Sequence, residues 1–376
     1  MKKVMFLIFC IFLVINLFGQ SPRLIGMGNV NGYLADDSDI FTYPATINSY
    51  GNIAYGYLND SDVSGDTNNF GLNYELPTAV LGLYFNKQLP SLAMDDNIIL
   101  THASLDKNFQ LFFAFNDNMA LRFSLAMDKY TSEDTSPEIT ESAMALGVGF
   151  GYSTEQLDLG VNILLPSYTN EIDNSSTTTE EKESKFIIDA NARSIFSQKD
   201  NVDWVGKLDF EFGSSTYDDD VAGTDDITSS VFNISLGLAG NVNIDDNNIL
   251  VLGVTPFGLL SSCSTDANDD TDTKTTMTLP AFNVGFESQI CKWLVVRSGI
   301  EQGYYIISNT NETNGVEQTD SNYDSYFNYA MGLGFVYKNF NLDCVFNKDF
   351  LHNGANFITG ATTSNIFGEI MLEYNF

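Results

Sequence analysis

Residues 229–244, SSVFNISLGLAGNVNI, alternate between apolar side chains and small or polar ones. Successive side chains of an extended strand point to opposite faces of a sheet, so this alternation places each kind of residue on its own face. The stretch therefore predicts a β-strand with one apolar and one polar face. The apolar positions are Phe232, Ile234, Leu236, Leu238, Val242 and Ile244, and the other face carries Asn233, Ser235, Gly237, Asn241 and Asn243.

The same alternation recurs from residue 52 to the end of the chain. It is clear in 119–130, 202–212, 326–337 and 367–376. Roughly sixteen such stretches can be marked, many of about 9 to 14 residues, which is the length that a tilted strand needs to cross a bilayer. Beyond residues 1–20 the apolar residues are dispersed among polar ones, so a bundle of membrane helices is excluded.

Two kinds of connection alternate between these stretches. Tight turns are expected at 116–118, 154–156, 199–201, 245–247 and near Lys292. The other connections are polar and are expected to be solvated loops of about ten or more residues, with acidic clusters at 59–66, 180–183, 218–226 and 266–272. Short turns at one end and long loops at the other are typical of outer-membrane barrels.

A closed sheet is the arrangement of strands that satisfies every backbone amide and carbonyl within hydrocarbon. A soluble sandwich would bury the apolar faces in a core and would need only about seven or eight strands. We therefore predict an all-β fold, a transmembrane antiparallel β-barrel of about 14 to 16 strands formed by residues 52–376 in a bacterial outer membrane. The segments at 53–58 and 97–105 leave the strand number open.

The first residues of the chain predict export. The basic start MKK is followed by an apolar run and by GQS, so residues 1–20 are expected to be a secretory signal peptide, with an uncleaved anchor as the alternative. The remaining cysteines, Cys263, Cys291 and Cys344, have no metal-type spacing, although one pair would be enough for a disulfide. The net charge of −32 disfavours binding to nucleic acid.

Residues 21–51 carry a motif that precedes the first strand. Gly26, Met27 and Gly28 are followed by the acidic pair Asp36 and Asp37, and then by Tyr43, Pro44 and Ala45. This pattern resembles the N-terminal segment of the FadL-like superfamily, which includes hydrophobic-compound channels and the PorV/PorQ-type barrels of type IX secretion. The resemblance implies a hatch or plug folded into the barrel lumen. Tyr43 departs from the pattern, because the family usually has Asn there.

Charged residues on the polar faces are expected to point into the lumen. Asp36 and Asp37 of the hatch would pair with lumen cations; alternatively, the lumen charges pair only with one another across the barrel. The cations are Arg122, Arg193, Lys207 and Arg297, and the lumen carboxylates are Asp189, Asp209, Glu211 and Glu301.

Three functions fit such a barrel. The first is a FadL-like channel for small hydrophobic or amphipathic molecules, with Tyr84, Phe112 and Tyr305 as candidate lining residues. The second is a PorV-type component of surface assembly or protein secretion that binds a partner through its loops. The third is a general porin. An enzyme is disfavoured because His102 and His352 are the only histidines and neither has the spacing of a catalytic set.

The C-terminal residues Tyr374 and Phe376 resemble the signature of outer-membrane barrels that the barrel-assembly machinery recognises. They would equally serve as aromatic residues at the membrane interface. Outer-membrane lipid and lipopolysaccharide are the other expected partners, and divalent cations bridging acidic loops such as 266–272 to lipopolysaccharide phosphates are a further hypothesis. No cofactor is expected.

Overall fold

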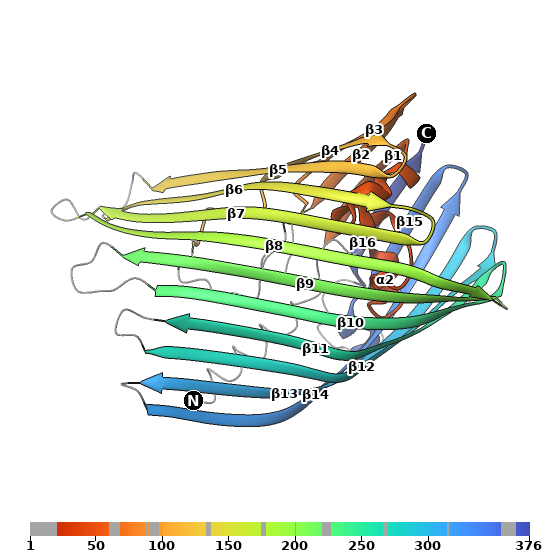
Figure 1. The fold of residues 1–376 in the computed structure, drawn as a ribbon. Helices are drawn as coiled ribbons and strands as arrows, with labels where there is room; N and C mark the ends of the chain where they lie inside the picture. Colours follow the sequence, from red (N-terminus) through yellow and green to blue (C-terminus); the bar gives the residue numbers. More distant parts are fainter. Residues whose placement is uncertain are drawn as a thin grey trace.

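The chain folds into a closed antiparallel barrel (Figure 1). The computed structural model describes residues 21–59, 68–87, 89, 98, 100–132, 137–173, 178–199, 201–219, 227–265, 270–313, 316–354 and 366–376. Within these ranges sixteen strands pair in sequence order, and the last strand returns to pair with the first. The predicted fold class is thus confirmed, at the upper end of the expected strand number.

The strands differ greatly in length. The barrel consists of β1 (Ile53–Asn59), β2 (Asn69–Leu76), β3 (Ala79–Phe85), β4 (Asn108–Asn116), β5 (Met119–Ser132), β6 (Glu138–Ser153), β7 (Leu157–Asp173), β8 (Thr178–Lys199), β9 (Val202–Asp219), β10 (Ile227–Asp245), β11 (Asn248–Thr265), β12 (Thr271–Cys291), β13 (Leu294–Thr313), β14 (Val316–Tyr337), β15 (Phe340–Phe346) and β16 (Phe367–Asn375). One wall, β6 to β14, is therefore much taller than the wall made by β15, β16 and β1 to β4.

The strands of the tall wall, β6 to β14, correct two expectations: that the strands would be about 9 to 14 residues long, and that the acidic cluster at 180–183 would be a loop. Strands β8 and β14 each contain 22 residues, more than the bilayer requires. The acidic cluster at 180–183 lies in β8, and Asp218 and Asp219 end β9, so these polar residues belong to strands that extend beyond the membrane band instead of to loops. The segment at 53–58 is a strand, whereas the described residues of 97–105 form none. The tight turns lie where they were expected.

The period-two pattern places apolar side chains outside the barrel. Along β6 the outward residues Leu146 and Val148 are 51% and 49% exposed, whereas inward Ala143 and Ala145 are 1% or less exposed. A continuous apolar outer surface is unfavourable in water and favourable against acyl chains. The barrel therefore has the surface of a membrane-spanning protein. Among the described residues, no helix combines the length and apolar character needed to cross a membrane.

Residues 21–52 fill the turn end of the barrel and form the plug (Figure 1). The plug contains α2 (Pro22–Gly26) and two short 3-10 helices, η2 (Asp37–Phe41) and η3 (Pro44–Ser49). A further helix, α3 (Lys348–Asn353), follows β15. Residues 1–20, 60–67, 220–226 and 266–269 lie outside the described residues. The predicted signal peptide and most of the acidic loops predicted at 59–66, 218–226 and 266–272 fall within them. Cys263, Cys291 and Cys344 are all free thiols.

Candidate functional site: the plug and the lumen above it

Local sequence signals shape the plug. Ser21 caps α2, Pro22 occupies its first turn, and Gly28 continues the chain with a φ of 79°, which glycine adopts without strain. Asp36 forms a capping box with Asp39 at the start of η2. The sequence predicts each of these local features, whereas the path of the chain between them depends on contacts with the barrel.

Glycines of the barrel wall receive the plug backbone. A β-carbon on Gly299 of β13 would overlap the carbonyl of Met27, and one on Gly285 of β12 would lie 2.6 Å from the same oxygen. On the opposite wall, a β-carbon on Gly160 of β7 would overlap the carbonyl of Thr42, and one on Gly151 of β6 would overlap the amide of Ala45. The predicted hatch residues Met27, Gly28, Pro44 and Ala45 thus lie directly against the wall.

Lumen side chains hold the plug by its carbonyl groups. Amide and guanidinium groups from strands around the barrel donate hydrogen bonds to these carbonyls, which satisfies backbone groups that a short irregular segment leaves unpaired. The bonds are Asn73 to Tyr50 (2.9 Å), Arg122 to Phe41 (2.7 Å), Asn162 to Thr42 (3.4 Å), Asn241 to Tyr33 (2.6 Å) and Asn283 to Gly28 (3.2 Å).

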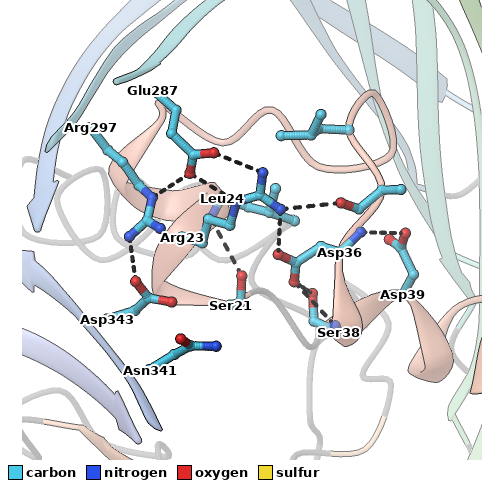
Figure 2. Close-up of polar contacts among 12 residues, drawn as sticks. Ser21, Arg23, Leu24, Asp36, Ser38, Asp39, Glu287, Arg297, Asn341 and Asp343 are labelled. Carbon is cyan, nitrogen blue, oxygen red and sulfur yellow. Dashed lines mark hydrogen bonds and ion pairs between the residues drawn. The ribbon is translucent and has the colours of Figure 1, made fainter. Parts of the chain in front are cut away.

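A charged cluster ties α2 to the wall (Figure 2). Arg23 donates two hydrogen bonds of 2.9 Å to Glu287 of β12, which also accepts a bond of 2.6 Å from Arg297 of β13. Arg297 pairs in turn with Asp343 of β15. Arg23 also lies 3.7 Å from Asp36, so this arginine joins both halves of the plug to β12, and Arg297 extends the network to β13 and β15.

A second cluster lies around Arg193 of β8. Its guanidinium binds Asp39 of the plug at 2.6 Å and Asp158 of β7 at 2.7 Å, and it lies 5.1 Å from the ring centroid of Tyr43. The Tyr43 side chain provides no capping hydrogen bond to η3 and is 1% exposed. Tyr43 therefore contributes a cation–π contact where the family pattern has an amide.

The expected pairing of Asp36 and Asp37 with lumen cations is wrong, and a third acid of the plug takes that role. Asp39 pairs with Arg193, but Asp36 pairs with Arg23 inside the plug, and among the described residues Asp37 forms no ion pair with a cation. Which cation Asp36 meets depends on the fold of the plug, because the carboxylate that takes part in the capping box also lies beside Arg23 of α2. Glu301 accepts hydrogen bonds from Asn29 of the plug and from Tyr326. Sequence reasoning missed Arg23 and Asp39, although an arginine three residues before the glycine motif is conspicuous in so acidic a chain.

Titration of Asp39 makes the plug sensitive to pH. Burial raises the pKa of Asp39 from 3.8 to about 6, against the opposing effect of Arg193. The folded state therefore binds this proton more tightly than the unfolded state, so the stabilising contribution is complete below pH 4 and is lost as the pH rises to about 6. The difference corresponds to about 3 kcal/mol.

We accordingly expect the Asp39→Asn variant to have a flatter stability profile between pH 4 and pH 6.5. Urea unfolding of the detergent-solubilised protein, followed at several pH values, would measure the profile. A variant profile parallel to that of the wild type would contradict the assignment.

Two of the three aromatic residues expected to line a pocket instead pack against the plug. Tyr84 and Phe112 are 1% and 0% exposed, and both pack edge-on against Phe41 of η2. They are therefore unavailable to a ligand while the plug is seated. Tyr305 lies nearer the loop end of the barrel and packs against Tyr326.

Above the plug the lumen has an apolar layer. It consists of inward side chains from six strands, β5 to β8, β10 and β11, and of residues from the segment between β3 and β4. The wall residues are Ala126, Ala145, Leu164, Ile187, Val231 and Leu260, and the segment contributes Leu89 and Leu105. Barrel lumens are ordinarily polar, so an apolar layer in this position is unusual.

The buried carboxylate of Glu141 in β6 binds the described end of this segment. It accepts hydrogen bonds from three consecutive amides, those of Thr101 (3.1 Å), His102 (2.7 Å) and Ala103 (3.0 Å). The His102 ring stacks on Tyr130 at 4.0 Å. Asp128 of β5 accepts a further bond from Ser104. We call residues 100–107 the lid.

Removing this carboxylate should loosen the lid. Each charge-assisted bond is worth about 1.5 to 3 kcal/mol, so we expect Glu141→Ala to increase opening of the lid by at least tenfold. Trypsin cleavage after Lys107 would report the opening, with Glu138→Ala, an exposed acid on the same strand, as the control. Equal cleavage rates in the two variants would contradict the role of Glu141.

The predicted C-terminal residues lie at the turn end. Tyr374 packs on Phe340 of the adjacent strand, and Phe376 stacks on Tyr74 of β2. Both side chains face outward, as residues of an interfacial aromatic belt do. Recognition by the barrel-assembly machinery remains a prediction. Among the described residues, no group of three or more His, Cys, Asp or Glu side chains is arranged to bind a metal ion.

Comparison with known proteins finds similarity of fold. No protein-family model and no curated protein matches the sequence. Among solved structures, the CymD monoaromatic hydrocarbon channel has 10% identity and a TM-score of 0.42, over 96% of this chain and 99% of that one. A FadL homologue of Pseudomonas aeruginosa has 11% identity and a TM-score of 0.42, over 95% and 98%.

Larger barrels are also similar. The siderophore receptor PirA from Acinetobacter baumannii has 10% identity and a TM-score of 0.39, over 78% of this chain, and the chain spans 61% of the length of that receptor. At these values the likeness extends to the barrel fold alone.

Proposed function

We propose that the protein is an outer-membrane channel for small hydrophobic or amphipathic molecules. The observation that supports this most directly is the apolar layer, which places Leu164, Ile187 and Val231 inside a barrel whose other inward residues are largely polar. These side chains are 2 to 3% exposed while Leu89 and Leu105 pack on them, so an apolar solute would bury its own apolar surface there after Leu89 and Leu105 move aside. The lid covers this layer from the loop end, and the plug closes the barrel at the turn end.

A general porin fits the lumen less well. The plug contacts strands around the barrel: glycines of the wall lie against its backbone, and lumen side chains bind its carbonyl groups. A wide water-filled path at this level is therefore disfavoured. Solutes would instead pass after a local rearrangement of the plug or through the wall.

Uptake of an apolar probe tests the proposal. Gram-negative cells producing the protein should take up N-phenyl-1-naphthylamine faster than cells without it. Ile187→Asn should abolish the gain because it places an amide in the apolar layer, whereas Ile188→Leu, on the lipid-facing side of the same strand, should preserve it. Identical uptake with and without the protein would overturn the proposed function.

A specific observation favours a second candidate, partner binding of the PorV type. Strand β14 pairs with β15 only from Gly332 to Tyr337, so residues 316–331 have no strand partner on that side within the described part of the chain. Such an edge is a template for adding a strand of another protein. A photo-cross-linker at Tyr323, which is 79% exposed, should then give one discrete adduct in intact cells. A smear or no adduct would argue against this function.

A further inference from the structure

The apolar outer surface of the barrel is lower on one side than on the other. We call β15, β16 and β1 to β4 the short wall, and its strands contain seven to nine residues each. A strand rises about 3.3 Å per residue and is tilted by about 40° in a barrel, so seven residues cover about 15 to 18 Å of membrane. Figure 1 shows these strands ending far from the loop ends of β6 to β14.

Strand β14, which borders the short wall, provides the comparison. Its exposed outward residues run from Tyr337 at the turn end through Met331 to Phe327. With the same rise and tilt this stretch covers about 25 to 28 Å, which is the height of the apolar band of outer-membrane barrels. Tyr337 is paired with Phe340, the first residue of β15, so the two strands start at one level and differ at their loop ends.

Charged residues stand where β15 stops. The strand ends at Phe346, and Lys348 and Asp349 of α3 follow it, both of them exposed. Lys348 donates a hydrogen bond of 3.3 Å to the side chain of Asn328, which follows Phe327 in β14. Charged groups thus lie at a height where β14 still has an apolar outer face. The surface of the bilayer is therefore expected to be lower beside β15 than beside β14.

Polar residues limit the other strands of the short wall in the same way. At the loop end, Asp60 follows β1 in the sequence, Asn86 and Lys87 follow β3, and Asp106 and Lys107 precede β4. Charged side chains are unfavourable in hydrocarbon. The sequence therefore offers no apolar residues beyond these strands that would raise the apolar surface to the height of β14.

Lipid fits this surface better than a second barrel. Tilting the whole molecule cannot lengthen the short wall, because both ends of the wall move together. Two convex barrels would touch along a narrow line, whereas the short wall is six strands wide and its outward side chains are exposed across that width, for example Phe70 and Leu372. Acyl chains can contact all six strands, and a bilayer adapts to a short apolar surface by thinning.

We propose that the short wall thins the outer membrane beside it and is a binding surface for lipids with short acyl chains. The difference in height between the two walls is about 10 Å. It lies at the loop end, which faces the cell exterior in outer-membrane barrels, so the outer leaflet is the one that thins. The tall wall meets a bilayer of ordinary thickness, and the preference is therefore confined to one side of the barrel. This inference does not depend on the proposed channel function.

Quenching of tryptophan fluorescence by brominated lipids tests the inference. The full chain, carrying Trp204→Phe and Trp293→Phe, would receive a single tryptophan through Phe113→Trp on β4 or through Phe282→Trp on β12. The two phenylalanines are a matched pair, because they face outward and are 40% and 45% exposed. Each protein would be reconstituted into mixed bilayers of dimyristoleoyl- and dioleoylphosphatidylcholine, with one of the two lipids brominated at a time.

The Phe113→Trp protein should show a preference of about threefold or more for the shorter lipid, and the Phe282→Trp protein should show none. Equal preferences in the two proteins would overturn the inference, since the height of the wall would then not select the lipid. Weak quenching of the Phe113→Trp protein by both lipids, with normal quenching of the Phe282→Trp protein, would also overturn it, because a second copy or another protein would then cover the short wall. Neither result bears on uptake of an apolar probe, so the proposed channel function is tested separately.

Discussion

Gly299→Ala is expected to unseat the plug. The added methyl group would overlap the Met27 carbonyl and lie against the backbone of Gly28, and neither group is the end of a flexible side chain that can move aside. Overpacking of this kind costs about 1 to 3 kcal/mol or more, which would shift the equilibrium between seated and displaced plug by about fivefold to more than about a hundredfold. Gly160→Ala should displace the plug in the same way from the opposite wall, where the overlap is with the Thr42 carbonyl.

Conductance of single molecules in planar bilayers would measure the effect. A barrel of sixteen strands without a plug encloses an aqueous channel, so displacement should appear as large, long-lived open events. Gly56→Ala is the matched control, because a β-carbon at this position of β1 meets no atom within 4 Å. If Gly160→Ala and Gly299→Ala both fold into barrels and both keep the wild-type conductance, these glycines do not determine the position of the plug.

The barrel could be predicted from the sequence because its determinants are local. Alternation such as that of residues 229–244 fixes which side chains face lipid, and the tight turns fix the ends of strands. The overhang of β8 and β14 was missed for a physical reason. Beyond the membrane band both faces of a strand meet water, so 180–183 and 316–325 lose the alternation and look like loops.

The plug seat was less predictable because it depends on residues distant in sequence. The motif around Gly26 and Pro44 located the segment, but Gly160 and Gly299 look like ordinary small residues of a polar face, and only the closed barrel brings them against the plug. The partners of Asp36 and Asp39 likewise depend on how the plug folds. A charge pattern predicts that lumen ions will pair, whereas the geometry decides which of them do.

Arg193→Met is expected to destabilise the plug and its wall by about 3 to 5 kcal/mol, because it leaves the carboxylates of Asp39 and Asp158 buried without their cation. The guanidinium also donates to the Leu34 carbonyl and covers the Tyr43 ring, so lysine should restore only part of the loss. Urea unfolding and protease cleavage of the plug would measure the change, with Lys292→Met in an exposed turn as the control.

Combining Arg193→Met with Asp39→Asn separates the charge effect from lost packing. If the cost of the single substitution comes mainly from an uncompensated plug carboxylate, the double variant should be more stable than Arg193→Met alone, since the amide carries no charge to bury. An additive loss would instead assign the effect to the contacts with Asp158, Leu34 and Tyr43. Because Asp39 belongs to the plug and Asp158 to the wall, the coupling energy from this cycle measures directly how strongly one lumen arginine fixes the plug to the barrel.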